Sequence, residues 1–347
     1  MKKITTINDV AREAGVAAST VSRVIANSPR ISKETSDRVL KIMKDMHYHP
    51  NLIARSLVNK STKIIGLVVP GATEKAFGHP FMSEMVRGII SVAHKKGYKI
   101  LVSSADNYNE EKELIDDLSK GGVVEGIILT ASRTNDPSIT ELKKQKFPFV
   151  LIGRPASDEL INWVDNNNMS VSYELTKHFI DQGHRDIAFL GLSPDVVVTV
   201  DRYEGYKKAM EESGIPVKTE NTAESKFLDA PGYDMMKELF DRKQKPSAVI
   251  CCDDYIAFGA MKFLSEQGLT VPEDMAIAGF NNTPLAEHFI PSLTSVDINA
   301  VTLGSSAFEM LYNTINKNIK GFNRTIIPSE IIIRKSSIKE QLKITSD

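Results

Sequence analysis

Residues 6–57 read TINDVAREAGVAASTVSRVIANSPRISKETSDRVLKIMKDMHYHPNLIARSL, and this stretch decides how the chain is organised. Its pattern predicts three short helices. The first starts after a cap at Thr6 or Asn8 and ends at Gly15, which supplies the permissive backbone of a tight turn. The second lies within residues 18–27, and the third starts after Ser32, a residue type that caps helices well.

The apolar residues of these helices recur at helical spacing and predict a small shared core. The second helix has three of them: Val21, Val24 and Ile25. They would pack on Val10 and Ala14 of the first helix. The stripe of the third helix consists of Val39, Leu40, Met43 and Met46. Two short helices joined by a glycine-containing turn, with a third helix holding them, describe a helix-turn-helix module.

The charge of the chain is distributed unevenly. The whole sequence of 347 residues has 43 Lys and Arg against 44 Asp and Glu, a net charge of −1. Residues 1–60 hold eleven basic and five acidic residues, so this part carries +6 and the other 287 residues carry −7. A positive segment on a nearly neutral chain indicates a polyanionic partner, because phosphate neutralisation supplies most nonspecific affinity for DNA.

The second helix is the element that would enter the major groove of DNA. Its outward residues are Ala18, Ser19, Ser22 and Arg23, with Thr20 beside the DNA backbone. An arginine in this place can donate two hydrogen bonds to guanine, worth about 1–3 kcal/mol of discrimination. The alternative is a small helical bundle with a solvated charged face, and the local charge of +6 favours DNA.

The stretch contains three further motifs: T-V-S-R-V at 20–24, R-I-S at 30–32 and Y-x-P-N-x-x-A-R-x-L at 48–57. In these it resembles the DNA-binding headpiece of the LacI/GalR family of bacterial transcriptional repressors. The resemblance implies that Ala18, Ser19 and Arg23 read bases. It also implies phosphate contacts, made by Asn8, Thr20, Ser22, Arg30, Tyr48 and Asn51. One departure is Ala17, since the family usually has a Ser or Thr cap there, and losing a cap costs about 1 kcal/mol.

Residues 50–61 form a predicted hinge helix and linker after a headpiece of residues 1–49. Pro50 starts a helix well, but a helix of about two turns is marginal alone and should form only against DNA or a second copy. The resemblance implies that paired hinge helices enter the minor groove through Ala54, Arg55 and Leu57. Leu57 would be the wedge in a central base step, and its alternative is an ordinary linker leucine.

From residue 62 onward, short apolar runs alternate with helical stretches. The predicted strands are 63–70, 98–104, 124–130, 149–153, 186–191, a run near 225–228, 248–252 and 275–280. The predicted helices are 81–96, 110–119, 139–144, 170–182, 202–213, 233–241, 255–267 and 300–316. Alternating strands and helices predict parallel, doubly wound sheets, and about eight such units favour two lobes over a single sheet.

This larger part, residues 62–338, resembles the effector domain of the same family, which is built like the periplasmic sugar-binding proteins. The predicted fold class is an all-α helix-turn-helix headpiece plus a two-lobed, doubly wound α/β domain for effector binding and dimerisation. We expect lobe 1 near 62–160, lobe 2 near 161–290, crossover segments over 291–338 and a tail over 339–347. The effector should lie between the lobes, at the carboxyl ends of the strands.

Six residues are candidates for holding the effector: Phe81, Arg154, Trp163, Arg202, Asp253 and Asn281. Arg202, Asp253 and Asn281 follow predicted strands as polar residues, which is what a site at strand ends requires. Asp253 precedes a helix, so it could instead be only a helix cap. Trp163 is the one tryptophan, and it could stack on a sugar ring or pack in the core.

Two departures bear on the effector. Many family members have Asp where this chain has Gly153, which Arg154 follows, and many have Asp where it has Asn281. The predicted effector site therefore has fewer carboxylates than the sites of those family members. The runs IGRP, WVDNNN and GFNN resemble the maltose-operon repressors of low-GC Gram-positive bacteria, which implies maltose or a maltodextrin as effector. The alternatives are a purine- or pentose-responsive repressor, and a catabolite-control type regulator whose phosphoprotein corepressor binds lobe 1.

An enzyme is the other class of function to weigh. The chain has no phosphate loop, dinucleotide fingerprint, nucleophile elbow or H-E-x-x-H motif, so we predict no catalysis, no cofactor and no metal. Lacking a signal-like or membrane-spanning apolar run, it is expected in the cytoplasm. We expect a homodimer on a near-palindromic operator. The tail after residue 337 is too short for a tetramer-forming coil.

Overall fold

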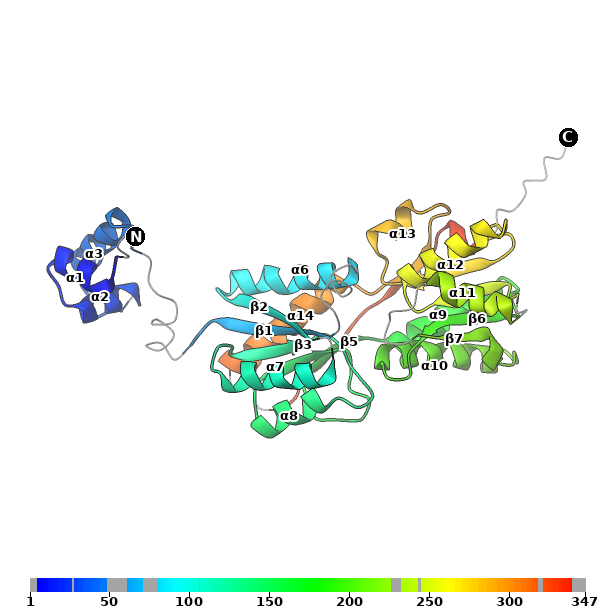
Figure 1. Ribbon diagram of the computed structural model, residues 1–347, viewed down its shortest axis with the longest axis horizontal. Helices are drawn as coiled ribbons and strands as arrows, with labels where there is room; N and C mark the ends of the chain where they lie inside the picture. The colour runs from blue at the N-terminus through cyan, green and yellow to red at the C-terminus, as the bar shows by residue number, and fades with distance from the viewer. Residues whose placement is uncertain are drawn as a thin grey trace. The chain divides into compact units, whose positions relative to one another are not determined.

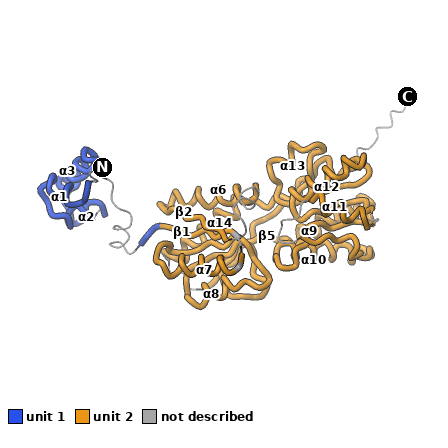
Figure 2. The backbone as a smooth tube through the Cα atoms, viewed as in Figure 1, with its two compact units in different colours: residues 1–63 blue, residues 64–347 orange. Residues whose placement is uncertain are grey.

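The computed structural model describes residues 5–26, 28–48, 61–70, 80–105, 107–225, 232–242, 245–317 and 321–338 (Figure 1). The chain divides into two compact units, residues 1–63 and residues 64–347 (Figure 2). The small unit is helical and the large one is α/β. The fold class predicted from the sequence is therefore confirmed.

The small unit, called the headpiece below, contains α1 (Ile7–Ala14), α2 (Ala18–Ile25) and α3 (Lys33–Asp45). Thr6 is the cap of α1, since its hydroxyl accepts from the Asp9 N–H and the Asp9 carboxylate accepts from the Thr6 N–H. Gly15 ends α1 with a φ of 62°, the left-handed region that glycine enters without strain. Ser32 caps α3 by accepting from the Thr35 N–H at 3.3 Å.

The core of the headpiece contains most of the predicted residues, while the predicted Ile25 and Met46 are half-buried and pack against it. Its buried residues are Val10, Ala11, Ala14, Val21, Val24, Val39 and Met43. Leu40 was expected in the stripe of α3, and this is wrong, because its side chain is 49 % exposed. A helix turns by about 100° per residue, so the residue after the inward-facing Val39 leaves the buried face.

The large unit contains two six-stranded sheets. The first has the order β11-β5-β4-β3-β1-β2, and its strands pair in parallel. Its members are β1 (Ile64–Pro70), β2 (Lys99–Ala105), β3 (Gly126–Leu129), β4 (Phe149–Ile152), β5 (Trp163–Asn166) and β11 (Arg324–Ile327). The predicted strands of this region are confirmed. We call this sheet and its helices the first lobe.

The second lobe is built on the sheet of order β12-β10-β9-β8-β6-β7, in which only β12 pairs antiparallel. Its members are β6 (Ile187–Leu192), β7 (Thr222–Glu224), β8 (Ala248–Cys251), β9 (Ala276–Phe280), β10 (Thr294–Asp297) and β12 (Glu330–Ile332). The strand predicted near 225–228 lies earlier, at β7. Residues 226–228 lie outside the described residues.

Helices cover both faces of the two sheets, as Figure 1 shows. The first lobe has α6 (Pro80–Lys95), α7 (Tyr108–Lys120), α8 (Pro137–Gln145) and α14 (Ala300–Asn316). The second lobe has α9 (Asn168–Asp181), α10 (Val197–Glu212), α11 (Gly232–Asp241), α12 (Asp254–Glu266) and α13 (Pro284–His288). The sequence missed α13, because five residues are too few to show a helical period. No helix within the described ranges is long and apolar enough to span a bilayer.

The lobe boundary lies later than expected. We predicted that lobe 2 starts near residue 161, but β5 belongs to the first sheet, so the chain first crosses between the lobes after Asn166. The chain returns through α14 and β11, and it crosses again between β11 and β12. The Asn166 side-chain amide donates to the carbonyl oxygens of Ile298 at 2.9 Å and Ile327 at 3.0 Å. One buried side chain thus ties all three crossovers together.

The first lobe is completed by a close approach of α6 and α14. A Cβ atom added at Gly88 would lie 2.1 Å from the Val301 carbonyl oxygen, and one added at Gly304 would lie 2.1 Å from that of Met85. Both glycines are therefore required for the two backbones to meet. The result is a helix from the C-terminal part of the chain packed on one from the start of the first lobe.

Candidate functional site

The exposed face of α2 carries the residues predicted to read DNA. Ser19 and Arg23 are exposed, while Ala18, Thr20 and Ser22 are half-buried beside them. Val21 and Val24 point the other way, into the headpiece core. Within the described residues no carboxylate pairs with Arg23, so its guanidinium is available to a base edge or a phosphate. The helix therefore presents the short polar and basic side chains that direct readout uses.

The start of α2 lacks a side-chain cap, as expected from Ala17. Among the described residues no side chain accepts from the first turn, and the Ala17 carbonyl accepts from Thr20 N–H at 2.8 Å and Val21 N–H at 3.2 Å. The turn is held instead by the bond from Val16 N–H to the Ala11 carbonyl, at 3.0 Å. α2 is thus positioned by backbone contacts and by its buried valines.

Three of the residues predicted to touch phosphates lie outside α2, each in a different place. Asn8 is exposed on α1, and Arg30 is exposed in the loop between α2 and α3. Tyr48 follows α3 and packs against the headpiece core, and its burial raises the pKa of its hydroxyl above the ordinary value. Four predicted contacts lie outside the described residues: Asn51, Ala54, Arg55 and Leu57.

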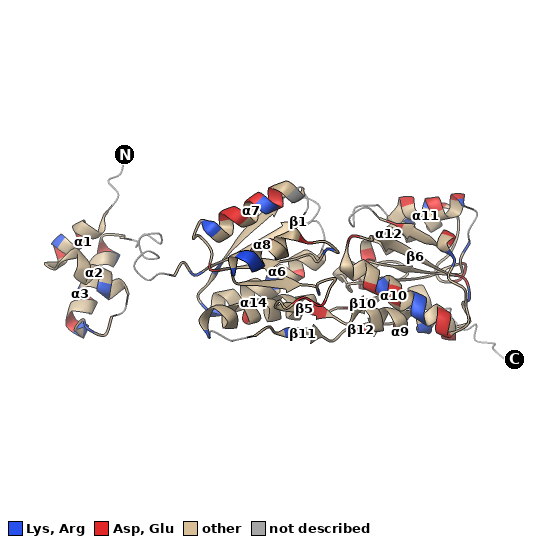
Figure 3. Ribbon diagram, turned by 90° about the horizontal axis from the view of Figure 1, so that it is seen from below, with Lys and Arg blue, Asp and Glu red and all other residues tan. Residues whose placement is uncertain are grey.

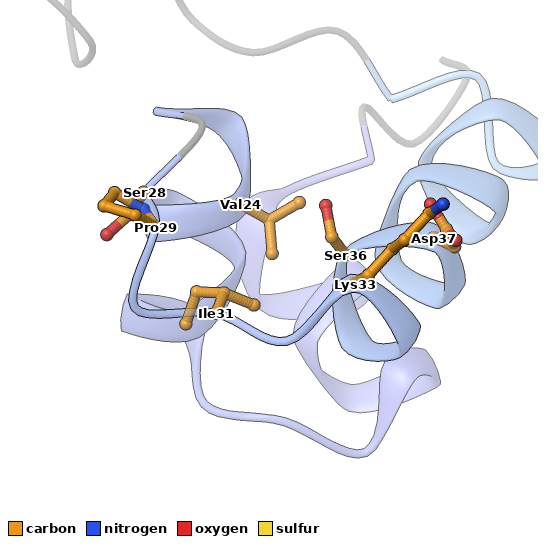
Figure 4. Close-up of a pocket in the computed structure, with 7 residues that line it drawn as sticks. All are labelled: Val24, Ser28, Pro29, Ile31, Lys33, Ser36 and Asp37. Carbon is orange, nitrogen blue, oxygen red and sulfur yellow. The ribbon is translucent and has the colours of Figure 1, made fainter.

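The headpiece also has a cavity of about 370 Å³ between the loop after α2 and the start of α3 (Figure 4). It is lined by Val24, Ser28, Pro29, Ile31, Lys33, Ser36 and Asp37. Val24 belongs to the buried side of α2, and neither Ser19 nor Arg23 lines the cavity.

In the second lobe, two of the predicted effector residues meet at neighbouring strand ends. Asp253 follows β8 and Asn281 follows β9, and the Asn281 amide donates to Asp253 Oδ2 at 2.5 Å. Asp253 also caps α12, because its Oδ1 accepts from the Tyr255 N–H at 2.6 Å. Asn281 has a φ of 95°, a backbone that L side chains rarely adopt. Asp253 is therefore a helix cap whose second carboxylate oxygen remains directed at Asn281, and its contact with an effector stays a prediction.

Arg202 is buried and joins three elements of the second lobe. Its Nη1 donates to the Cys252 carbonyl at 2.6 Å and its Nε to Asn168 Oδ1 at 3.1 Å. The guanidinium also lies 4.2 Å from the centre of the Phe280 ring. Burial lowers the pKa of Arg202 below its usual value. Arg202 thus fixes the end of β8 against the starts of α9 and α10.

Arg154 comes from the first lobe and reaches into the second. Its Nε donates to Asp201 Oδ2 at 2.6 Å, and its Nη2 bonds the other carboxylate oxygen. Its backbone N–H donates to Asp165 Oδ2 at 3.0 Å, and burial raises the pKa of Asp165 to about 6. Because Asp201 precedes Arg202, this ion pair lies beside the residues just described.

Two aromatic candidates differ in their placement. Phe81, at the start of α6, packs against the apolar clusters of both lobes and therefore lies where they meet. Trp163 packs instead against the cluster of Phe149, Leu151 and Ile161 in the first lobe. It is the first residue of β5, at the end opposite the carboxyl ends of the strands. The structure does not bring Trp163 together with the other candidates, and the packing alternative fits its place.

Sequence reasoning missed several residues of this region. Asp165 and Asn168 sit in the WVDNNN run, and Asp201 stands next to a residue that was chosen. A polar run directly after an apolar strand was the available signal for Asp165 and Asn168. Asp254 is also buried beside Asp253, and its carboxylate accepts from the Thr283 N–H and the Ser295 hydroxyl. In the described part of the chain no three His, Cys, Asp or Glu side chains gather as a metal site would require.

Comparison with family models gives two matches. Residues 6–51 match the model described as bacterial regulatory proteins, lacI family, and residues 176–337 match that of the periplasmic binding protein-like domain. The first covers the headpiece and the second covers most of the second lobe and the returning segments.

Whole-chain comparison gives similar regulators. The chain is 35 % identical over 336 residues to the HTH-type transcriptional regulator MalR of Streptococcus pneumoniae, covering 95 % of this chain and 98 % of MalR. It is 32 % identical over 333 residues to the HTH-type transcriptional repressor PurR of Histophilus somni, covering 95 % of this chain and 98 % of PurR.

Two solved structures are similar along the whole chain. The complex of transcriptional regulator CelR with cellobiose has a TM-score of 0.76 at 29 % identity, covering 96 % of this chain and 100 % of CelR. The lac repressor dimer bound to operator has a TM-score of 0.86 at 23 % identity, covering 97 % of this chain and 100 % of the repressor chain, and shows the fold.

Proposed function

Because the chain belongs to the lacI family of bacterial regulatory proteins, we propose that this DNA-binding transcriptional regulator is a repressor of carbohydrate-utilisation genes, controlled by maltose or a maltodextrin. The observation that carries the DNA half is the exposed face of α2, with Ser19 and Arg23 free of carboxylate partners in the described residues. Short polar side chains around one arginine suit readout in a major groove. We expect it to act in the cytoplasm.

The effector half of the proposal is supported by the groups at the strand ends. Asp253, Asn281 and Asn168 supply carboxylate and amide groups, and Phe81 supplies a partly buried aromatic ring, near the meeting of the lobes. Neutral polyhydroxylated ligands are bound by such mixed donors and acceptors beside apolar rings. The similarity to MalR, and the cellobiose held by CelR, are consistent with a sugar.

A ligand screen on the purified protein tests this half. Glucose, maltose, maltotriose, cellobiose, ribose and hypoxanthine are each added, and the melting temperature of the large unit is followed by the fluorescence of its single tryptophan, Trp163. Maltose or maltotriose should raise the melting temperature and change the affinity for operator DNA, since a ligand bound only by the folded state stabilises it. A response to hypoxanthine alone would replace the sugar with a purine, as the similarity to PurR would then suggest.

We further propose that the regulator works as a homodimer on a near-palindromic operator. The described part of the first lobe exposes apolar residues on α6 and on β2, the edge strand of its sheet: Ile90, Leu101 and Val102. Exposed apolar residues beside an unpaired strand edge suit a contact with a second copy. Light scattering should give a mass twice that of the chain. The double variant Leu101→Lys, Val102→Lys should lower the measured mass toward that of a single chain.

A further inference from the structure

The two lobes bond directly to each other away from the three crossovers. Residues 132–134 of the first lobe run beside residues 195–197 of the second. The Thr134 N–H donates to the Asp195 carbonyl and the Val197 N–H to the Ser132 carbonyl, both at 3.1 Å, around an antiparallel bridge between Arg133 and Val196. These contacts join the segment after β3 to the segment after β6, on the side where the effector is proposed to bind.

The first-lobe side of this contact is anchored. The Arg133 guanidinium donates to both oxygens of Glu111, at 3.0 and 2.8 Å, and the Ser138 hydroxyl donates to Glu111 at 2.9 Å. The Glu111 side chain is 5 % exposed. The Ser132 hydroxyl also bonds the Arg154 carbonyl. Residues 132–134 and Arg154 are therefore parts of one rigid edge of the first lobe.

Arg154 extends from this edge to Asp201 in the second lobe, and it binds both carboxylate oxygens. The Asp201 side chain is 6 % exposed, whereas that of Arg154 is 37 % exposed. Within the described residues, Arg154 is the one group that the structure gives as a side-chain partner of the Asp201 carboxylate. A buried carboxylate left without its partner is strongly unfavourable unless water reaches it.

Arg154 approaches Asp201 from the opposite lobe, so any separation of the lobes would break the ion pair and leave the Asp201 carboxylate to water. We propose that Arg154 and Asp201 form a latch between the lobes, that this latch holds them together before any ligand binds, and that it sets the affinity for the effector. The first two statements concern the apo protein, and the third rests on the proposed function.

The latch assigns Arg154 a role different from direct contact with the ligand. Arg154 positions one lobe on the other, so its removal acts through the population of the closed state. When only the closed state binds, the apparent Kd rises in inverse proportion to the closed fraction. Loss of the latch should therefore raise the Kd for a sugar by about tenfold or more.

Lobe separation is measured by energy transfer between dyes on the full-length protein. Lys144→Cys on α8 and Glu211→Cys on α10 provide one exposed site in each lobe, while Cys251 and Cys252 are buried and protected from labelling. Arg154→Met, without ligand, should lower the transfer efficiency. The matched control is Arg324→Met, because the Arg324–Asp158 pair lies within the first lobe, and its transfer should stay at the wild-type level.

A compensating variant separates a latch from a ligand contact. Arg154→Met with Asp201→Leu replaces the ion pair by two apolar side chains, an exchange that buried pairs often tolerate. The double variant should regain both wild-type energy transfer and, for maltose or maltotriose, a Kd within about threefold of wild type. Asp201→Asn serves as a second single variant, and Trp163 fluorescence on heating checks that each protein is folded.

Each of these measurements has an outcome that would contradict one statement of the proposal. Unchanged energy transfer in folded Arg154→Met would overturn the latch. Restored transfer with affinity still lost would mean that Arg154 touches the ligand, which overturns the third statement. If the wild-type protein binds no sugar, the proposed effector class fails, while the ligand-free energy transfer still tests the latch.

Discussion

Replacing Ala17 by Ser should stabilise the headpiece. Ala17 occupies the cap position of α2 with a φ of −71° and a ψ of 150°, the extended backbone that a cap requires, but it has no side-chain acceptor. A Ser hydroxyl there would accept from the second or third N–H of the helix, those of Ser19 and Thr20. Caps contribute about 1 kcal/mol, within a range of about 0.5–2 kcal/mol.

The size of the effect follows from the size of the unit. For a domain of about 60 residues, 1 kcal/mol corresponds to a shift of about 4–8 °C in melting temperature. Trp163 lies in the large unit, so its fluorescence does not report on the headpiece. Hydrogen exchange of the amides of Val21 and Val24 reports on the stability of the headpiece, and Ala17→Ser should slow this exchange about fivefold.

The matched control is Ala26→Ser at the other end of α2. Ala26 is exposed and follows the last helical residue, and its own N–H already donates to the Ser22 carbonyl at 3.0 Å. Its exchange rates should stay near those of the wild type, as expected for a surface substitution. Equal exchange rates in the two variants would refute the reasoning, because the bond from Val16 to Ala11 would then already stabilise the turn fully.

Three other predictions concern DNA and pH. Arg23→Ala should cost about 1–3 kcal/mol in binding to operator and little on unrelated DNA, as measured by competition gel shift, and an equal loss on both would assign Arg23 to phosphate. Leu57→Ala should weaken operator binding and reduce the DNA bend while nonspecific affinity stays, so a normal bend in a circular-permutation assay would disprove the wedge. Burial raises the pKa of Asp165 to about 6 and that of Asp254 to about 7, both from 3.8. These carboxyls bind protons more tightly when folded, so their contribution to stability is full below about pH 4 and is lost as the pH rises through 6–7. The large unit should melt lower at pH 8 than at pH 5.5, and Asp254→Asn should reduce the difference.

The headpiece was predictable because its signals are local. Thr6, Gly15 and Ser32 mark helix ends through bonds that span only a few residues, and these assignments agree with the structure. Leu40 was misplaced because a count of apolar residues every three or four positions does not say which of two adjacent ones faces inward. Both Val39 and Leu40 fit the spacing, and packing selected Val39.

The candidate effector site was predictable only in part. Strand ends with polar residues located Asp253 and Asn281, and the structure joins them by a hydrogen bond. The pairing of Arg154 with Asp201 spans 47 positions and two lobes, and no local period reports such a contact. Trp163 could not be placed from the sequence either, because an aromatic residue in a strand can stack on a sugar or pack in a core. Its place at the start of β5 is what distinguishes these two interpretations.

The return of α14 and β11 to the first lobe has a consequence for synthesis. The headpiece is complete once its third helix has emerged, but the first lobe waits for a helix that the ribosome makes roughly 150 residues after β5. At about 5–20 residues per second, that interval lasts roughly 8 to 30 s. Throughout it, the side of α6 that will meet α14 through Gly88 has no cover, so the nascent chain presents a half-built lobe to its surroundings while the second lobe is still being translated.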